Sequence, residues 1–395
     1  MHTIKLKPNR DKNARKHHPW IFSGALAKTS SNIGPGEIVR GEDSQGEFVA
    51  YGYYNAKSQI AVRLLEWDEH ARIDRAWWLK KIRSSIERRK SILENKGTDS
   101  CRLLFGESDF LPGLIVDKYA SFIVIQTLTA GIDRVKSDIV SILDELLHPD
   151  GVYEKSESGA REMEGLPESS GVLAGAEPSG LLTITENSHK FLVDIRSGQK
   201  TAFYLDQREN RKIVSGYAAG QEILDCFCYT GGFSVYALEA GAKSATLVDS
   251  SEQSLKIASE NLKLNGLNQR PHEIIEEDVF RILRRFREQG RVFDMAILDP
   301  PKFAPNKASL KKALSAYKDI NLLASQIVRP GGILVTFSCS GAVDVQTLQT
   351  VLFWAAADSG RQIQILKALS QGEDHPRLAT FPESEYLKGF VCRVI

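Results

Sequence analysis

Residues 222–242 read EILDCFCYTGGFSVYALEAGA and carry the pattern of one strand, one tight turn and one helix. The apolar stretch 222–227 is typical of a buried strand, and 233–242 is typical of a helix. Gly231 and Gly232 lie between them, where they let the backbone turn tightly and approach a ligand. The stretch predicts the first βα unit of an α/β sheet, with a ligand site at its turn.

The same alternation of strand and helix continues to the C-terminus. After residue 242 the chain alternates apolar, β-branched runs with amphipathic ones. The predicted strands are 244–250, 273–278, 293–299 and 333–338, and the predicted helices are 254–266, 279–289 and 318–328. This order predicts a doubly wound parallel sheet, a Rossmann-like α/β fold, over residues 186–395.

Two further regions precede this one. Residues 1–70 contain short strand-like runs and turns, which predict a small β-rich barrel. Residues 71–185 predict a central α+β domain with one long amphipathic helix at 73–95. In the same domain, 106–128 predicts a hairpin, and 156–180, rich in Gly, Ser, Glu and Pro, predicts a surface loop before the strands at 181–187 and 189–195.

The bulk composition excludes several classes of protein. The chain has 395 residues, of which 26% are charged and 42% hydrophobic, as in ordinary folded proteins. We expect no membrane span, because no apolar run reaches the ~18 residues required, and the basic N-terminus has no apolar core typical of a secretory signal. Five cysteines without a CxxC pair favour a reducing cytoplasm and argue against a metal site.

Acidic residues end the predicted strands of the C-terminal region. Asp249 ends the second strand, where a carboxylate can accept both ribose hydroxyls of an adenosine. Asp278 and Val279 follow the third strand and are suited to flank an adenine. An acid at a strand end also commonly caps the next helix. Together with the turn at Gly231, which does not match G-x-G-x-x-G, these residues predict an adenosine pocket without deciding which adenosine cofactor it holds.

The fourth strand ends in the sequence DPPKF, residues 299–303. Two prolines fix the backbone and remove two N–H donors, which leaves carbonyl groups without a competing local amide. Such a segment suits the hydrogen-bonding edge of a planar, nitrogen-rich substrate and has no use in a nicotinamide dehydrogenase. A rigid turn is the structural alternative.

Taken together, these segments resemble the class I S-adenosylmethionine methyltransferases. More closely, they are similar to the RlmI-type cytosine-5 methyltransferases of large-subunit (23S) ribosomal RNA, along the whole chain. The matching segments in the C-terminal region are DCFCYTGGFS (225–234), LVDSSE (247–252), ILDPPKF (297–303), TFSCS (336–340) and FPESEYLKGFVCRV (381–394). Those before it are RKHHPWIFSGAL (15–26), which resembles the start of a PUA-like RNA-binding domain, FLPGLIVDKY (110–119) and GQKTAFYLDQRENR (198–211).

The resemblance implies S-adenosylmethionine as cofactor and large-subunit ribosomal RNA as partner. It implies a PUA-like domain at 1–70 and the methyltransferase domain at 186–395. The implied substrate-binding residues are Pro300, Pro301, Lys302 and Phe303. The implied cofactor-binding residues are Asp225, Phe227, Thr230, Gly231, Asp249, Ser250, Asp278, Val279 and Asp299.

Cys339 lies between two serines where the predicted strand 333–338 ends. A free cysteine is most often a small core residue, and this is our interpretation of Cys226, Cys228 and Cys392. C5 of cytosine is a poor nucleophile, and a thiolate that adds to C6 activates it. We therefore predict that Cys339 is the nucleophile and that Asp299 contacts the base edge.

Two alternatives remain open from the sequence. One is an RNA guanine N-methyltransferase in which Cys339 is not catalytic, since N-methylating relatives share DPPKF. The other is a non-catalytic RNA-binding module, which the presence of Asp225, Asp249 and Asp299 argues against. Basic clusters at 5–17 and 80–90 suggest phosphate contacts although the net charge is only +1. A monomer and a homodimer are both compatible with the sequence.

Overall fold

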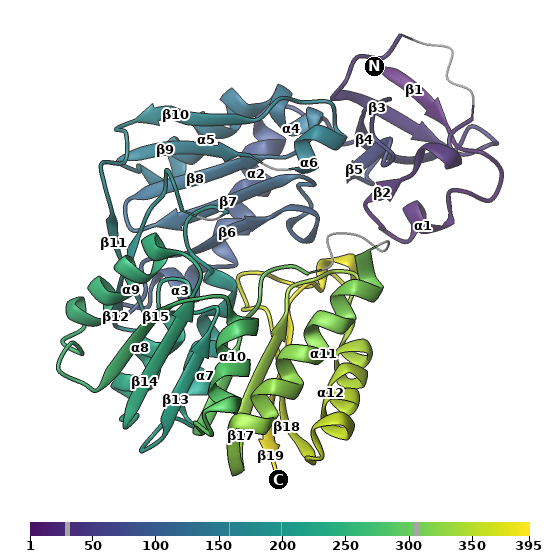
Figure 1. The fold of residues 1–395 in the computed structure, drawn as a ribbon. Coiled ribbons are helices and arrows are strands. Elements are labelled where there is room, and N and C mark those ends of the chain that lie inside the picture. The colour runs from purple at the N-terminus through teal and green to yellow at the C-terminus, as the bar shows by residue number, and fades with distance from the viewer. Residues whose placement is uncertain (28–31, 158, 199, 304–308) are drawn as a thin grey trace. The chain divides into compact units, whose positions relative to one another are not determined.

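The computed structural model describes residues 1–27, 32–157, 159–198, 200–303 and 309–395 (Figure 1). The chain forms two compact units, each built from several segments. The first unit consists of Met1–Thr185, Val193–Leu205 and Glu373–Ser384, and the second consists of Glu186–Leu192, Asp206–Gly372 and Glu385–Ile395. The predicted domains 1–70 and 71–185 both fall in the first unit, and their boundaries remain predictions.

The N-terminal part of the first unit is a five-stranded sheet in the order β1-β3-β4-β5-β2. β1 is parallel to β3, and the other neighbours are antiparallel. Ile4, Val39 and Leu64 contribute to its core. The elements are β1 (His2–Lys5), α1 (Lys12–Arg15), β2 (Trp20–Ile21), β3 (Glu37–Glu42), β4 (Phe48–Tyr54) and β5 (Val62–Glu66).

A second five-stranded sheet follows in the order β10-β9-β8-β7-β6. The predicted hairpin is present, because β7 and β8 pair antiparallel. The strands are β6 (Cys101–Phe105), β7 (Leu114–Tyr119), β8 (Phe122–Thr127), β9 (Gly151–Ser156) and β10 (Ser169–Gly175). The helices are α2 (Arg75–Glu87), α3 (Lys90–Leu93), α4 (Ala130–Arg134), α5 (Lys136–Leu147) and α6 (Gly159–Met163).

Two predictions for this region were wrong. The single helix predicted at 73–95 is divided into α2 and α3. Arg89, at the break, is 2% exposed and donates both terminal nitrogens to Asp109 at 2.7 and 2.6 Å. The loop predicted at 156–180 contains α6 and the edge strand β10, which pairs with β9. Its Gly- and Ser-rich composition conceals a strand whose backbone is held by its neighbour.

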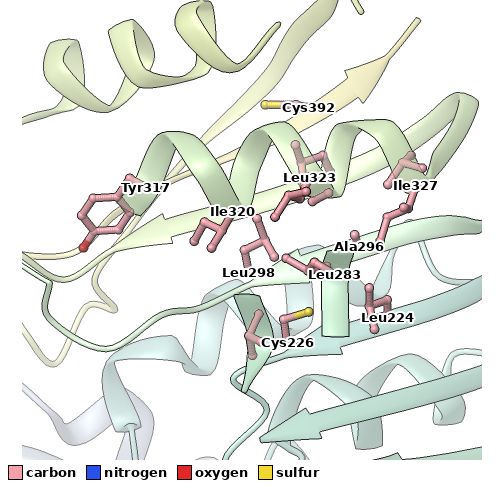
Figure 2. Packing of buried hydrophobic residues seen from close by; sticks show 14 of the residues in the cluster. Leu224, Cys226, Leu283, Ala296, Leu298, Tyr317, Ile320, Leu323, Ile327 and Cys392 are labelled. Atoms are coloured by element: carbon pink, nitrogen blue, oxygen red, sulfur yellow. The ribbon is translucent and has the colours of Figure 1, made fainter. Parts of the chain in front are cut away.

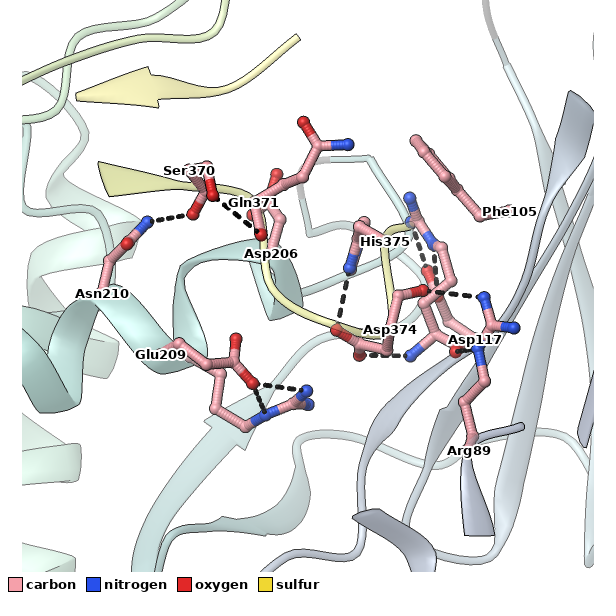
Figure 3. Close-up of polar contacts among 12 residues, drawn as sticks. Arg89, Phe105, Asp117, Asp206, Glu209, Asn210, Ser370, Gln371, Asp374 and His375 are labelled. Atoms are coloured by element: carbon pink, nitrogen blue, oxygen red, sulfur yellow. Dashed lines mark hydrogen bonds and ion pairs between the residues drawn. The ribbon is translucent and has the colours of Figure 1, made fainter. Parts of the chain in front are cut away.

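The first unit is completed by a segment from near the C-terminus. Asp374 accepts a hydrogen bond from the backbone of Arg102 at 2.9 Å, and its carbonyl oxygen accepts one from Arg89 at 3.0 Å (Figure 3). The His375 ring, 1% exposed, lies 3.0 Å from the Asp374 carboxylate. Asp374 and His375 therefore anchor this segment in the unit.

The second unit contains a seven-stranded sheet in the order β15-β14-β13-β16-β17-β19-β18. The first five strands are parallel, and β19 is antiparallel to both neighbours. This confirms the predicted doubly wound sheet. The strands are β13 (Glu222–Cys226), β14 (Ser244–Asp249), β15 (His272–Glu276), β16 (Phe293–Leu298), β17 (Val328–Ser338), β18 (Ile363–Ser370) and β19 (Lys388–Val394).

Helices join the parallel strands of this sheet. α11 (Leu310–Ile327) lays Ile320, Leu323 and Ile327 against strand residues such as Leu298 (Figure 2). The other helices are α7 (Arg208–Ser215), α8 (Gly232–Glu239), α9 (Glu252–Leu264), α10 (Val279–Glu288) and α12 (Val345–Ser359). The strands predicted at 181–187 and 189–195 form the two-stranded sheet of β11 (Leu182–Glu186) and β12 (His189–Val193). No helix in the described ranges is long and apolar enough to cross a membrane.

Candidate active site

The predicted site residues lie at the carboxyl ends of adjacent parallel strands. β13 pairs with β14 on one side and with β16 on the other. The strand order reverses at β13, and ligands of open α/β sheets bind at such a switch point. The loop after β13, Asp249 at the end of β14, Asp299 after β16 and Cys339 after β17 therefore share one edge of the sheet.

The loop after β13 has an unusual backbone. Phe227 and Tyr229 have φ of 59° and 49°, in the left-handed region that non-glycine residues rarely adopt, and Gly231 has φ of 77°. Strain of this kind concentrates at ligand sites. A Cβ on Gly231 would lie 3.1 Å from the Cβ of Ala258, so glycine also allows the close packing of this turn on α9.

Two buried polar atoms beside this loop lack a partner. Asp225 is 1% exposed, and its Oδ2 accepts a hydrogen bond from Ser234 at 2.7 Å. Its Oδ1 and the Oγ1 of Thr230 have no hydrogen-bond partner among the residues that the structure describes. Leaving such an atom unpaired costs about 1–3 kcal/mol. Both atoms therefore fit a bound group that carries hydrogen-bonding atoms of its own.

The environment of Asp225 also affects its ionisation. Burial raises the pKa of its carboxyl to about 7, although the hydrogen bonds from Ser234 oppose the shift. Asp249 adds a small contribution in the same direction as burial. A cationic or hydrogen-bond-donating ligand group would favour the ionised form.

Asp249 connects the end of β14 to the loop after β13. Its Oδ2 accepts from the backbone N–H of Tyr229 and its Oδ1 from that of Ser251, both at 2.9 Å. The carboxylate is half-buried and next to the exposed Ser250. Since each carboxylate oxygen has two acceptor positions, the group can still accept hydrogen bonds from a ligand.

The third strand end serves the helix that follows it. The Oδ1 of Asp278 accepts from the backbone N–H of Arg281 at 3.0 Å and caps α10. Val279 is 3% exposed and belongs to the hydrophobic core. For Asp278 the capping alternative is therefore present, and the residue itself is exposed.

Asp299 is held by a chain of side-chain amides. Gln207 donates from Nε2 to the Asp299 Oδ2 at 2.9 Å, and its Oε1 accepts from Asn210 at 2.6 Å. Both amide residues are 2% exposed. Sequence reasoning missed them, because neutral amides in the segment 198–211 carry no pattern of charge or spacing. The amide chain fixes one oxygen of Asp299 and the orientation of the other.

The remaining residues of the DPPKF segment differ in exposure. Pro300 is buried, while Pro301 and Lys302 are exposed. Phe303 is half-buried, with its ring centroid 4.9 Å from that of Tyr317 and 6.3 Å from that of Phe227. Phe303 therefore joins the DPPKF segment to the loop after β13.

Cys339 contacts the DPPKF segment. It follows the last residue of β17, and its sulfur lies 3.8 Å from the carbonyl oxygen of Pro300, to which the thiol donates. Pro301 has no backbone N–H, so no amide of that residue competes with the thiol for a hydrogen bond to the Pro300 carbonyl oxygen. The structure thus brings together the two segments that the proposed chemistry requires.

Cys339 differs from the other cysteines in its exposure. It is half-buried, whereas the other four are buried: Cys101, Cys226, Cys228 and Cys392. Burial raises the pKa of the Cys392 thiol to about 12 and also raises those of Cys226 and Cys228. Thiolate chemistry on a bound substrate is therefore possible at Cys339 and strongly disfavoured at those three buried positions.

In the described ranges, no group of three His, Cys, Asp or Glu residues could hold a metal ion.

The comparisons with known proteins agree with the geometry. Residues 4–67 match a PUA-like domain, and residues 162–378 match an S-adenosylmethionine-dependent methyltransferase. The chain belongs to the S-adenosylmethionine-dependent methyltransferase family. Its cofactor is S-adenosylmethionine, as predicted, and the unpaired atoms of Asp225 and Thr230 fit such a ligand.

Relatives of this methyltransferase match over nearly the whole chain. It is 43% identical over 390 residues to Ribosomal RNA large subunit methyltransferase I of Klebsiella pneumoniae (strain 342), covering 99% of this chain and 98% of that protein. The protein of the same name from Salmonella arizonae is 42% identical over 391 residues, covering 99% and 97%. These matches confirm the predicted resemblance.

Solved structures share the fold of the methyltransferase. SMU.776, described as a methyltransferase and solved in complex with SAH, has a TM-score of 0.88 at 22% identity, with full coverage of both chains. A SAM-dependent methyltransferase from Streptococcus mutans has a TM-score of 0.86 at 21% identity. At these identities the similarity supports the fold alone, and it agrees with the predicted fold class.

Proposed function

We propose that this protein methylates C5 of a cytosine in large-subunit (23S) ribosomal RNA, in the cytoplasm, through a covalent adduct with Cys339. The observation that carries the proposal is the position of Cys339, half-buried at the end of β17 and 3.8 Å from the carbonyl oxygen of Pro300. The relatives named Ribosomal RNA large subunit methyltransferase I support the substrate class.

The chemistry explains why a cysteine is needed. The Cys339 thiolate adds to C6 of the cytosine, which makes C5 an enamine-like carbon nucleophile. S-adenosylmethionine supplies the electrophilic methyl group. After C5 is methylated, a base removes its proton, the C5–C6 double bond reforms and the C6–S bond breaks. The thiolate of Cys339 is then regenerated for the next cycle.

The remaining residues have supporting roles in this proposal. Asp299, oriented by Gln207, hydrogen-bonds the edge of the cytosine. The walls of the substrate site are Pro300, Pro301, Lys302 and Phe303. The residues proposed to hold the cofactor are Asp225, Phe227, Thr230, Gly231, Asp249, Ser250, Asp278, Val279 and Asp299.

The substrate base must be accessible at C6, which the thiolate attacks, and at C5, which receives the methyl group. Attack at C6 requires that the base leaves any helix, so the target lies in a single-stranded segment or is flipped out. The N-terminal part of the first unit carries exposed cations that suit the RNA backbone. They are Lys5, Lys7, Arg10, Lys12 and Lys16.

The test is a trapping experiment with RNA that carries 5-fluorocytosine at the target. Fluorine replaces the C5 proton, so elimination is blocked after methylation and the adduct accumulates. We expect the wild-type protein to give a stable protein–RNA species on a denaturing gel. The Cys339→Ser variant should give none, because an alcohol is a far weaker nucleophile at neutral pH.

Cys392→Ser is the matched control, since Cys392 is buried in β19 and should leave trapping unchanged. Trapping by Cys339→Ser but not by Cys392→Ser would show that the nucleophile is the other cysteine. Undiminished methyl transfer by Cys339→Ser would refute the covalent mechanism, and methylation of a guanine nitrogen would then replace it.

A further inference from the structure

The two serines beside Cys339 are fixed by one tyrosine. Ser338 donates from its Oγ to the hydroxyl of Tyr317 at 2.9 Å, and the same hydroxyl lies 3.1 Å from the Oγ of Ser340. Tyr317, on α11, is fully buried. The backbone on both sides of Cys339 is therefore held at a fixed distance from α11.

A buried lysine also contacts this turn. Lys388 begins β19 and is paired with Ser338 in the antiparallel register. It is 2% exposed, and its Nζ donates to the carbonyl oxygens of Ser340 at 3.1 Å and Glu385 at 3.5 Å. It forms no ion pair with a carboxylate in the described part of the chain. Two carbonyl contacts leave one of its three N–H donors for another group.

The charged groups around Lys388 include the sulfur of Cys339. Burial has the largest effect on the pKa of the Lys388 amine, and it lowers that pKa. The charges of Glu385, Cys339 and Asp344 oppose this effect, and that of Lys302 adds to it. Asp344 caps α12 through the backbone of Thr347 at 2.7 Å, which holds the pKa of its carboxyl low and keeps it ionised. The pKa of the Tyr317 hydroxyl is raised, mainly by burial, and a negative charge at Cys339 adds to this rise.

We propose that Lys388 is the positioning residue that keeps Cys339 in its reactive form, as an ammonium–thiolate pair inside the turn. The inference rests on the proposed role of Cys339 as nucleophile. In the step involved, the S–H bond of Cys339 breaks and its proton forms an N–H bond with the neutral amine of Lys388. When the thiolate later leaves C6 of the base, the same ammonium stabilises it again.

The pair brings a buried positive charge to the nucleophile from another strand. Of the cations on β17 and in the DPPKF segment, Lys302 is exposed, and Arg329 lies near the start of β17 whereas Cys339 follows its end. Lys388 supplies that charge from β19, a strand that is distant in sequence but adjacent in the sheet.

The test measures the reactivity of Cys339 in the full chain without RNA. Iodoacetamide alkylation of Cys339 is followed by peptide mass spectrometry across the pH range in which thiols titrate, with Cys339→Ser as the background. Lys388→Gln keeps hydrogen-bond donors for the two carbonyls but removes the charge. We expect its midpoint of alkylation to move to higher pH and its rate at neutral pH to fall roughly tenfold. Lys388→Arg should retain most of the wild-type rate.

Lys155→Gln is the matched control. Lys155 is a 5% exposed lysine of the first unit whose Nζ donates to the backbone carbonyls of Ile195 and Gly198, so it resembles Lys388 without a neighbouring cysteine. Its substitution should leave the alkylation profile of Cys339 unchanged. An unchanged profile in folded Lys388→Gln, or an equal loss in Lys155→Gln, would overturn the inference. If Lys388→Gln does not fold, Lys388→Arg becomes the test, because arginine keeps the positive charge. Loss of Cys339 alkylation in folded Lys388→Arg down to the background of Cys339→Ser would then overturn the inference.

The outcome is independent of the trapping experiment. Alkylation needs neither RNA nor methyl transfer, so a failure here leaves the proposed cytosine chemistry standing. Conversely, loss of the cytosine chemistry in the trapping experiment would leave a measured shift in Cys339 reactivity intact.

Discussion

Asp225 shows how one buried carboxyl couples the cofactor site to stability. It lies at the end of β13 with one oxygen unpaired, and its pKa is raised to about 7. The ligand-free protein therefore bears an energetic cost for ionising this group near neutral pH. A ligand that pairs the free oxygen removes part of this cost.

The substitution Asp225→Asn tests this coupling. The folded pKa lies above the unfolded one, so the wild-type protein is most stable when the group is protonated and loses stability as pH rises to about 7. Asparagine does not titrate and still accepts the hydrogen bond from Ser234. Between about pH 5 and pH 8, the variant should gain roughly 2–3 kcal/mol relative to the wild type. Denaturant unfolding of the ligand-free proteins measures this difference, and parallel pH profiles would contradict it.

A second prediction concerns Asp249. Its removal takes acceptors from the cofactor site and frees the backbone amides of Tyr229 and Ser251. Asp249→Ala should weaken binding of S-adenosylmethionine by about 1–3 kcal/mol in titration calorimetry. Asp319→Ala, which removes an acid that pairs with Arg284 on neighbouring helices, is the control and should bind normally. An unchanged affinity of Asp249→Ala would place the ribose elsewhere.

At the scale of elements, the basic stretch 80–90 has a structural role that its composition does not reveal. Lys81 pairs with Glu66 at 3.1 Å, and both Arg88 and Arg89 pair with Asp109. The charges that suggested an RNA surface are in large part used to fix α2 and α3 to the rest of the first unit. Lys80 and Arg83 remain exposed on α2.

The pair of Arg89 with Asp109 should dominate the stability of this region. Arg89→Met leaves a fully buried carboxylate with only the partly exposed Arg88 beside it, and we expect a loss of about 3–5 kcal/mol. Denaturant unfolding followed by the fluorescence of Trp77 and Trp78, which lie in the same core, reports it. Lys90→Met, at an exposed position, should change stability by less than about 0.5 kcal/mol. Similar denaturant midpoints for Arg89→Met and Lys90→Met would show that Asp109 pairs with other groups when Arg89 is absent.

The sequence allowed prediction of those elements whose residue pattern lies within the element itself. The alternation of strands and helices was sufficient for the five parallel strands of the second unit but not for the antiparallel pair β18 and β19. Each strand-end residue could be placed by counting from its own strand. Gln207, Tyr317 and Lys388 were missed because tertiary contacts alone bring them to the site. Likewise, β10 becomes a strand only through its pairing with β9.

At the scale of the whole molecule, the N-terminal sheet is joined to the rest of the first unit by buried polar contacts. Glu164, 2% exposed, accepts from Asn55 at 2.9 Å and from Arg63 at 2.8 Å. The hydroxyl of Tyr53 bonds to Thr129 at 3.0 Å. Deleting residues 1–70 would leave these groups unpaired, so the RNA surface is better tested by changing its charges.

We expect neutralisation of this surface to reduce RNA affinity and its dependence on salt. The substitutions are Lys→Gln or Arg→Gln at Lys5, Lys7, Arg10, Lys12 and Lys16. Each lost phosphate contact should lower the slope of log affinity against log salt by about 0.7–0.9. Binding assays at several salt concentrations measure it, with Lys256→Gln and Lys263→Gln on α9 as the control pair. An unchanged slope would move the RNA surface to another part of the chain.

The segment Glu373–Ser384 has a consequence for biosynthesis. The first unit needs Asp374 beside Arg89 and Arg102, and Phe381 against Trp20 with ring centroids 4.6 Å apart. A nascent chain therefore cannot complete this unit until residues 373–384 have been translated, although domains commonly fold in the order of their synthesis. Chains arrested before residue 373 should remain protease-sensitive within residues 1–185, and full resistance there would contradict this order. Residues 1–185 thus remain unfinished while the ribosome makes Asp206–Gly372 of the second unit.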